Sequence, residues 1–148
     1  MSSSDTKRVG NPETATGEKR MAVRVWLLGG FRVSVGSRTI TQDAWRLRKA
    51  AALVKLLALA PGHRMHREQA MDLLWSDSAR SRVANNLRQV LYGARRVLDP
   101  ASDSPERYLR LRDEQLVLCP DGQLWVDVTA FEEAAAEAGA DPFLEGLL

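Results

Sequence analysis

Between Arg82 and Leu98 the sequence carries polar side chains that can form two hydrogen bonds with the edge of a single DNA base. Asparagine and glutamine amides match adenine in this way and arginine matches guanine, each good pair contributing about 1–3 kcal/mol of discrimination. Because successive residues turn by about 100° around a helix, these side chains share one face, and that face has no carboxylate. The pattern predicts a base-contacting surface made of Asn85, Arg88, Gln89, Tyr92 and Arg96.

The lack of acidic residues on this face separates it from an ordinary solvated helix. Such a helix usually mixes glutamate with lysine, since opposite charges pair between successive turns. An arginine-rich surface helix also occurs in proteins that bind acidic partners, so periodicity and charge alone leave both interpretations open.

A second set of arginines flanks this helix and could pair with phosphate oxygens, because the guanidinium group matches them in charge and geometry. Some lie near a predicted hairpin, and others lie at the start of another helix, whose N-terminus adds partial positive charge. The residues predicted to contact phosphates are Arg64, Arg67, Arg82, Arg95, Arg107, Arg110 and Arg112.

The charges are spread unevenly along a chain whose formal net charge is only +2. Eight arginines and three acids lie between Arg80 and Arg112, whereas nine acids and no lysine or arginine follow from Asp113 to the end. This asymmetry indicates a surface for a polyanion next to a segment that a polyanion would repel.

Hydrophobic periodicity predicts the elements that must position these side chains. β-Branched residues that alternate with polar ones predict strands, and apolar residues at helical spacing predict three helices. Alternation on either side of Asp113 and Glu114 predicts a hairpin. The predicted ranges are strands 23–28, 31–35 and 38–41, helices 45–60, 66–75 and 82–98, hairpin strands 108–112 and 115–118, and a further strand 123–127.

Strands, helix, helix, turn, longer helix and hairpin follow the order of a winged helix-turn-helix domain. In that domain the last helix enters the major groove and the hairpin touches the flanking backbone. The sequence therefore predicts an α+β fold over residues 21–127, with an N-terminal antiparallel sheet, a three-helix core and a C-terminal wing. Cys119 is expected to be a small apolar residue in a strand. His63 and His66 are expected to cap or pack near a helix start.

The two ends are predicted to differ from this domain. Residues 1–20 have almost no large apolar side chain, so ordering them would cost entropy without burial, and we predict a disordered tail. Residues 128–148 are predicted to form a flexible acidic helix. Thr129 and Glu132 have capping-box spacing at its start, ahead of the alanine-rich run 130–138.

Several short segments form an ordered set between residues 23 and 131. They are Leu28–Phe31, Trp45–Ala50, Leu57–Arg64, Arg67–Gln69, Leu74–Trp75, Asn85–Arg88 and Ala94–Leu98. As a set they resemble the bacterial antibiotic regulatory proteins, which join an OmpR-type winged helix to a bacterial transcriptional activation domain. The resemblance implies that helix 82–98 is the recognition helix and that residues 108–118 form the wing.

The same resemblance implies a transcription regulator, usually an activator, that binds promoter DNA at direct repeats and contacts RNA polymerase. Residues 128–148 would be the truncated start of the activation domain. The chain would then be either a truncated relative or an excised DNA-binding portion. The oligomeric state stays open, because tandem binding on repeats needs no stable dimer.

Other functional classes find less support in the sequence. It has no nucleophile with a base and an orienting group, no glycine-rich phosphate loop and no cluster of metal ligands. We therefore expect no catalysis, no metal and no cofactor. No stretch is apolar and long enough to span a bilayer, and no signal peptide is evident, so we expect a cytoplasmic protein. The alternative to a DNA-binding regulator is a protein-interaction module whose winged helix has little DNA affinity.

Overall fold

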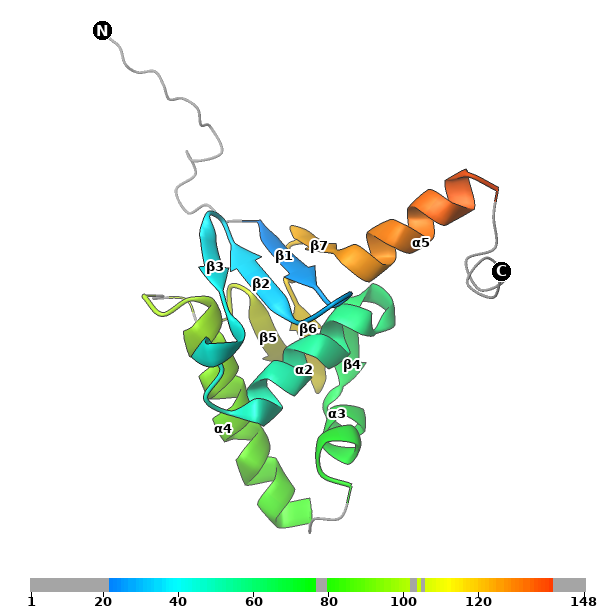
Figure 1. Cartoon of the computed structure of the whole chain (residues 1–148). Coiled ribbons are helices and arrows are strands. Elements are labelled where there is room, and N and C mark those ends of the chain that lie inside the picture. Colours follow the sequence, from blue (N-terminus) through cyan, green and yellow to red (C-terminus); the bar gives the residue numbers. More distant parts are fainter. Residues whose placement is uncertain (1–21, 77–79, 102–103, 105, 140–148) are drawn as a thin grey trace, which may run out of the picture.

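The computed structural model describes residues 22–76, 80–101, 104 and 106–139, with the backbone alone for residues 80–85. Its fold is mixed α+β, as the sequence predicts, and Figure 1 shows the arrangement. The elements are β1 (Val23–Trp26), β2 (Arg32–Val35), β3 (Arg38–Ile40), η2 (Gln42–Ala44), α2 (Arg48–Leu59), η3 (Pro61–His63), β4 (Arg64–His66), α3 (Arg67–Leu74), α4 (Arg80–Leu98), β5 (Leu109–Arg112), β6 (Gln115–Leu118), β7 (Leu124–Val126) and α5 (Asp127–Glu137). The tail predicted for residues 1–20 lies outside the described residues.

The first sheet contains four strands in the order β3-β2-β1-β7. The pairs β1–β2 and β2–β3 are antiparallel, as predicted. β7 instead joins the free edge of β1 in parallel, with Val25 opposite Val126. The expected antiparallel sheet is therefore a mixed sheet. Its fourth strand comes from the C-terminal part of the chain, because β2 covers only one edge of β1 and the backbone groups of the other edge need partners.

The second sheet contains three strands in the order β4-β6-β5. β5 and β6 form the predicted hairpin, and its two-residue turn has positive φ at both Asp113 (54°) and Glu114 (66°), as a type I′ turn requires. β4 is missing from the sequence prediction. It follows Gly62, whose φ of 65° helps to turn the chain out of α2 and toward β6.

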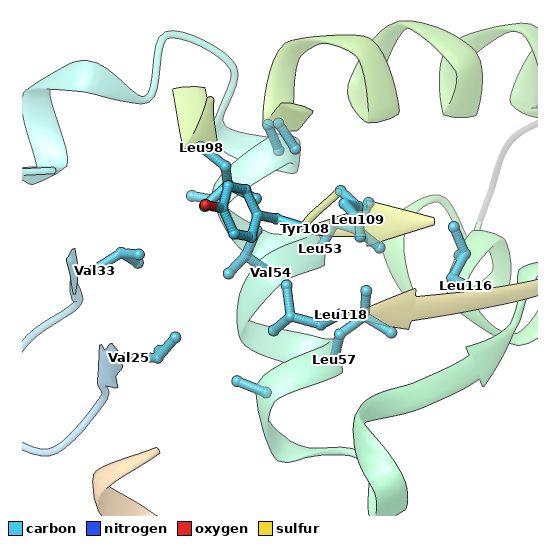
Figure 2. Close-up of a cluster of buried hydrophobic side chains, with 14 of the residues drawn as sticks. Val25, Val33, Leu53, Val54, Leu57, Leu98, Tyr108, Leu109, Leu116 and Leu118 are labelled. Atoms are coloured by element: carbon cyan, nitrogen blue, oxygen red, sulfur yellow. The ribbon is translucent and has the colours of Figure 1, made fainter. Parts of the chain in front are cut away.

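The hydrophobic core lies around α2, which contacts both α3 and α4. α3 and α4 also contact each other, so all three helices are in mutual contact. Figure 2 shows α2 between the two sheets, with its buried side chains directed to both sides. The labelled core residues are Val25 and Val33 of the first sheet, Leu53, Val54 and Leu57 of α2, Leu98 and Tyr108, and Leu109, Leu116 and Leu118 of the second sheet.

α5 follows β7 directly and packs against β1 and β7. It begins at Asp127, whose carboxylate accepts hydrogen bonds from the backbone nitrogens of Leu27 (2.9 Å) and Leu28 (3.0 Å). Thr129 thus lies inside the helix, and the N-cap is Val126, without a side-chain hydrogen bond. The predicted capping box is therefore wrong. None of the residues of α5 is buried, and the helix extends away from the two sheets in Figure 1.

Among the described residues, no helix combines the length and the hydropathy needed to cross a membrane.

Candidate nucleic-acid interface

The exposed face of α4 carries the side chains that the sequence predicts to contact bases. Arg88, Gln89, Tyr92 and Arg96 are all exposed, and Tyr92 is 63% exposed despite its large ring. The opposite face, which consists of Leu87, Val90, Leu91, Ala94 and Leu98, is buried against the rest of the fold. The helical periodicity therefore predicted the orientation of α4 correctly for its described side chains.

Tyr92 and Arg96 lie one turn apart on this face and interact. The Nη1 atom of Arg96 donates a hydrogen bond to the hydroxyl of Tyr92 (3.4 Å), and the guanidinium carbon lies 5.8 Å from the ring centroid. A cation and an aromatic face attract each other weakly at an exposed site. The contact restricts the rotamers of both side chains and leaves the remaining nitrogens of Arg96 available to a ligand.

The backbones of Arg82 and Asn85 belong to the first turns of α4, but their side chains lie outside the described residues. Their assigned contacts with phosphate and base therefore stay predictions.

The outer face of the second sheet gathers three of the arginines predicted to contact phosphates. Arg64 on β4 and Arg110 on β5 both stand opposite Val117 of β6, and Arg112 stands opposite Gln115. Residues paired across strands share a face of the sheet, so these arginines lie on the side opposite the core residues Leu109, Leu116 and Leu118. We call Arg64, Arg110 and Arg112 the sheet arginines.

These arginines differ in how freely they can reach a ligand. Arg64 and Arg112 are exposed, whereas Arg110 is half-buried and its Nε atom has no hydrogen-bond partner among the described residues. The Nη2 atom of Arg112 lies 3.5 Å from the Oε1 atom of Glu106, in a pair whose side chains are 62% and 44% exposed. Since such surface pairs contribute little, Arg112 can exchange this carboxylate for a phosphate at small cost.

Arg95 and Arg107 both make contacts within the fold, and their predicted phosphate contacts stay predictions. The Nε atom of Arg95 donates to the carbonyl of Leu109 (2.9 Å), and burial lowers the pKa of its guanidinium group while the charge of Glu106 opposes that shift. Arg107 Nη1 lies 3.8 Å from Asp99 Oδ2, and both side chains are only about a quarter exposed. The two arginines join the end of α4 to the start of β5.

Replacing Arg95 by alanine distinguishes a structural role of this side chain from a contact with phosphate. Arg95→Ala is expected to lower the free energy of unfolding by about 1–2 kcal/mol, because the Leu109 carbonyl loses a charged donor. DNA affinity at a temperature where the variant is folded should change little. Urea denaturation followed by circular dichroism measures the first quantity. Unchanged stability with a weaker affinity for DNA would instead support a phosphate contact by Arg95. The exposed Arg48→Ala serves as the control.

The remaining predicted residues near this surface make local contacts, and the phosphate contact predicted for the Arg67 side chain stays a prediction. Arg67 is half-buried, and its backbone nitrogen donates to the carbonyl of Glu114 at the turn of the hairpin (2.9 Å). His66 caps α3, because its Nδ1 atom accepts a hydrogen bond from the Glu68 nitrogen (3.1 Å). His63 packs near the end of α2 with its Nδ1 atom 3.3 Å from the Leu57 carbonyl. These contacts confirm the expectation for both histidines.

Cys119 is buried, as a small apolar residue would be, but it follows β6 and adopts a φ of 53° instead of lying within the strand. Burial, aided by the carboxylate of Asp121, raises the pKa of its thiol to about 12. The thiol is therefore protonated at neutral pH and a poor nucleophile. In the described part of the chain, no group of three or more His, Cys, Asp and Glu residues could hold a metal ion.

Sequence reasoning missed an open hollow of about 1040 Å³ beside α4. One side is formed by the segment from β3 through η2 to the start of α2, and the other by the C-terminal half of α4. Arg38 joins the two sides, since its guanidinium group donates to the carbonyls of Val97 (3.4 Å) and Leu98 (2.5 Å). The hollow is lined by Arg38, Thr39, Ile40, Thr41, Ala44, Arg46, Leu47, Ala50, Arg88, Gln89, Tyr92, Gly93, Arg96, Val97 and Pro100, and we call it the arginine hollow.

The described fold thus combines a mixed α+β architecture with two basic surfaces, on α4 and on the second sheet. No family model matches the chain, and no curated protein matches it significantly. Among solved structures, the chain is similar to Mycobacterium tuberculosis EmbR, determined in complex with a low-affinity phosphopeptide. The TM-score is 0.55 at 16% sequence identity, and the match covers 70% of this chain and 27% of the EmbR chain. The similarity establishes a related fold, and this chain spans about a quarter of the length of EmbR.

Proposed function

We propose that this chain is a sequence-specific DNA-binding transcription regulator of the winged helix-turn-helix type. The observation that carries the proposal is the exposed face of α4, where Arg88, Gln89, Tyr92 and Arg96 offer hydrogen-bonding groups without a carboxylate. α4 enters the major groove with this face, together with Asn85, and its amide and guanidinium groups bond to base edges.

The hairpin β5–β6 acts as the wing and contacts the phosphate backbone next to the site read by α4. The sheet arginines support this role, because they place three positive charges on the outer face of the sheet that contains the hairpin. Arg82 adds a phosphate contact at the start of α4. These contacts set the register of the protein on DNA and contribute affinity for any sequence.

The similarity to EmbR supports the fold on which this proposal rests. By this proposal the chain works in the bacterial cytoplasm, where it binds promoter DNA at direct repeats and contacts RNA polymerase. The proposed role needs no catalytic group, metal or cofactor.

Fluorescence anisotropy tests the proposal. Labelled duplex from the promoter beside the encoding gene and a scrambled duplex of the same composition are titrated with the protein at a fixed low salt concentration. We expect tighter binding to the promoter duplex. Absence of binding to both duplexes would overturn the proposal and favour the protein-interaction module.

Three variants in the same assay distinguish helix from wing. Arg96→Ala and Gln89→Ala should each weaken binding to the promoter duplex by about tenfold and binding to the scrambled duplex much less, because a base contact is lost. Arg110→Ala should weaken binding to both duplexes by similar factors, because a phosphate contact carries no sequence information. Equal losses on both duplexes from all three variants would contradict this division of roles.

A further inference from the structure

The arginine hollow has an apolar floor that the fold leaves open to water. Ile40 and Ala50 form its buried part, and Leu47 also lines it with 45% of its surface exposed. The backbone of α4 comes close at Gly93, where a Cβ atom would lie 3.1 Å from the Cδ1 atom of Leu47. Glycine at this position thus lets Leu47 lie against α4, which continues the apolar floor from α2 to α4.

The rim of the hollow is positively charged. Arg46, Arg88 and Arg96 are exposed and contribute guanidinium groups from both sides. The fourth arginine, Arg38, is held by the carbonyls at the end of α4. No aspartate or glutamate occurs among the described residues that line the hollow, so no lining carboxylate neutralises these charges. A positive rim around an apolar floor complements a molecule with an apolar body and a negative group.

We propose that the arginine hollow is a binding site for a small amphipathic anion, with an aromatic or aliphatic body and a carboxylate, sulfonate or phosphate group. The volume of about 1040 Å³ is just above the range typical of small-molecule sites, which ends at about 1,000 Å³. The body lies on Leu47 and Ile40, and the negative group pairs with Arg46 and with Arg88 or Arg96.

Occupancy of the hollow opposes DNA binding. Arg88, Gln89, Tyr92 and Arg96 line the hollow and also form the face of α4 that contacts bases in the proposed function, on which this second part of the inference rests. A ligand that engages these side chains removes them from DNA, so the two ligands compete and each lowers the affinity for the other.

The probe for this site is 1-anilinonaphthalene-8-sulfonate, an aromatic anion whose fluorescence rises in apolar surroundings. We expect saturable binding of one molecule per chain. N-Phenyl-1-naphthylamine has the same rings and no sulfonate, and it should bind about tenfold more weakly because it lacks the attraction of the rim. Equal affinities for the two dyes would contradict the proposal that the arginines of the rim attract the negative group.

Two pairs of variants test whether the dye binds in the hollow, and none of them changes a residue that the proposed function assigns to DNA binding. Arg46→Glu should weaken binding of the anionic dye by about tenfold and leave the neutral dye unchanged, whereas Arg48→Glu, which does not line the hollow, should affect neither. Ala44→Trp should block both dyes by filling the hollow, and its neighbour Gln42→Trp should block neither. Circular dichroism verifies that each variant is folded. The proposed site would be contradicted if the control variants lost dye binding. It would also be contradicted if all four variants bound the dyes as the unmodified protein does.

Adding promoter duplex to the complex with the anionic dye then tests competition. We expect the duplex to displace the dye and quench its fluorescence. A duplex that binds by anisotropy while the dye stays bound would overturn the competition. A duplex that does not bind at all would overturn the proposed function, while the dye titrations would still decide whether the hollow is a binding site.

Discussion

Raising the monovalent salt concentration from about 50 to about 200 mM is expected to weaken binding of this protein to duplex DNA by roughly a hundredfold. The sheet arginines and Arg82 supply about four phosphate contacts in the proposed complex, and each contact releases nearly one condensed counterion from DNA. The logarithm of the association constant should then fall with the logarithm of salt concentration with a slope of about −3.6. Anisotropy titrations on the scrambled duplex measure this slope without a contribution from sequence preference.

A pair of double variants assigns the slope to particular residues. Arg64 and Arg112 are the exposed members of the sheet arginines, and replacing both by glutamine should reduce the slope by about 1.8. The matched control replaces Arg24 and Arg48, two exposed arginines outside both basic surfaces, and removes the same charge. Equal changes in the two double variants would mean that net charge, and not the outer face of the sheet, determines binding. A slope near zero in the unmodified protein would contradict the DNA-binding proposal.

The parts of the fold that the sequence predicts correctly are those determined by neighbours along the chain. The buried face of α4 follows from apolar residues three and four positions apart, and the hairpin follows from alternation around Asp113 and Glu114. The exposed polar face of α4 could be identified in advance for the same reason. Once Leu87, Val90 and Leu91 are buried, the geometry of the helix directs Gln89 and Tyr92 outward.

The elements that the sequence does not predict depend on contacts between distant residues. β4 consists only of Arg64, Met65 and His66, and three residues with one buried side chain are too few for an alternating pattern to be recognised. It becomes a strand because β6 offers a free edge. The parallel pairing of β7 with β1 joins residues about a hundred positions apart, and no local pattern specifies that partner.

The same limit applies to the candidate site. Arg64 is expected near a helix start, and β4 places it on the same face of the sheet as Arg110, with Val117 of β6 between them. Arg95 and Arg96 are neighbours in the sequence and equally basic, but a turn of about 100° sends the first toward Leu109 and the second toward solvent. The arginine hollow depends on how β3, η2 and α2 stand against α4, so composition and periodicity give no indication of it.

Replacing Asp127 by alanine is expected to lower the free energy of unfolding by about 2 kcal/mol. The carboxylate accepts hydrogen bonds from the backbone nitrogens of both Leu27 and Leu28, and it thereby fastens the turn after β1 to the start of α5. Its negative charge also lies in the first turn of α5, where the helix dipole favours it. Urea denaturation followed by circular dichroism measures the change. The fluorescence of Trp26 and Trp125, whose ring centroids are 5.6 Å apart beside this contact, provides a local probe.

Thr129→Ala is the matched control, because it distinguishes the observed helix start from the one that the capping-box spacing predicts. If Thr129 were the N-cap, its replacement would cost about 1 kcal/mol, and that of Asp127 would cost less. In the structure Thr129 lies within the helix, where alanine has the higher helix propensity, so Thr129→Ala should leave stability unchanged or raise it slightly. Asp127→Asn should fall between the unmodified protein and Asp127→Ala, since the amide keeps one acceptor oxygen and loses the charge. A larger loss from Thr129→Ala than from Asp127→Ala would contradict the start of α5 at Asp127 and the connection that it makes to β1.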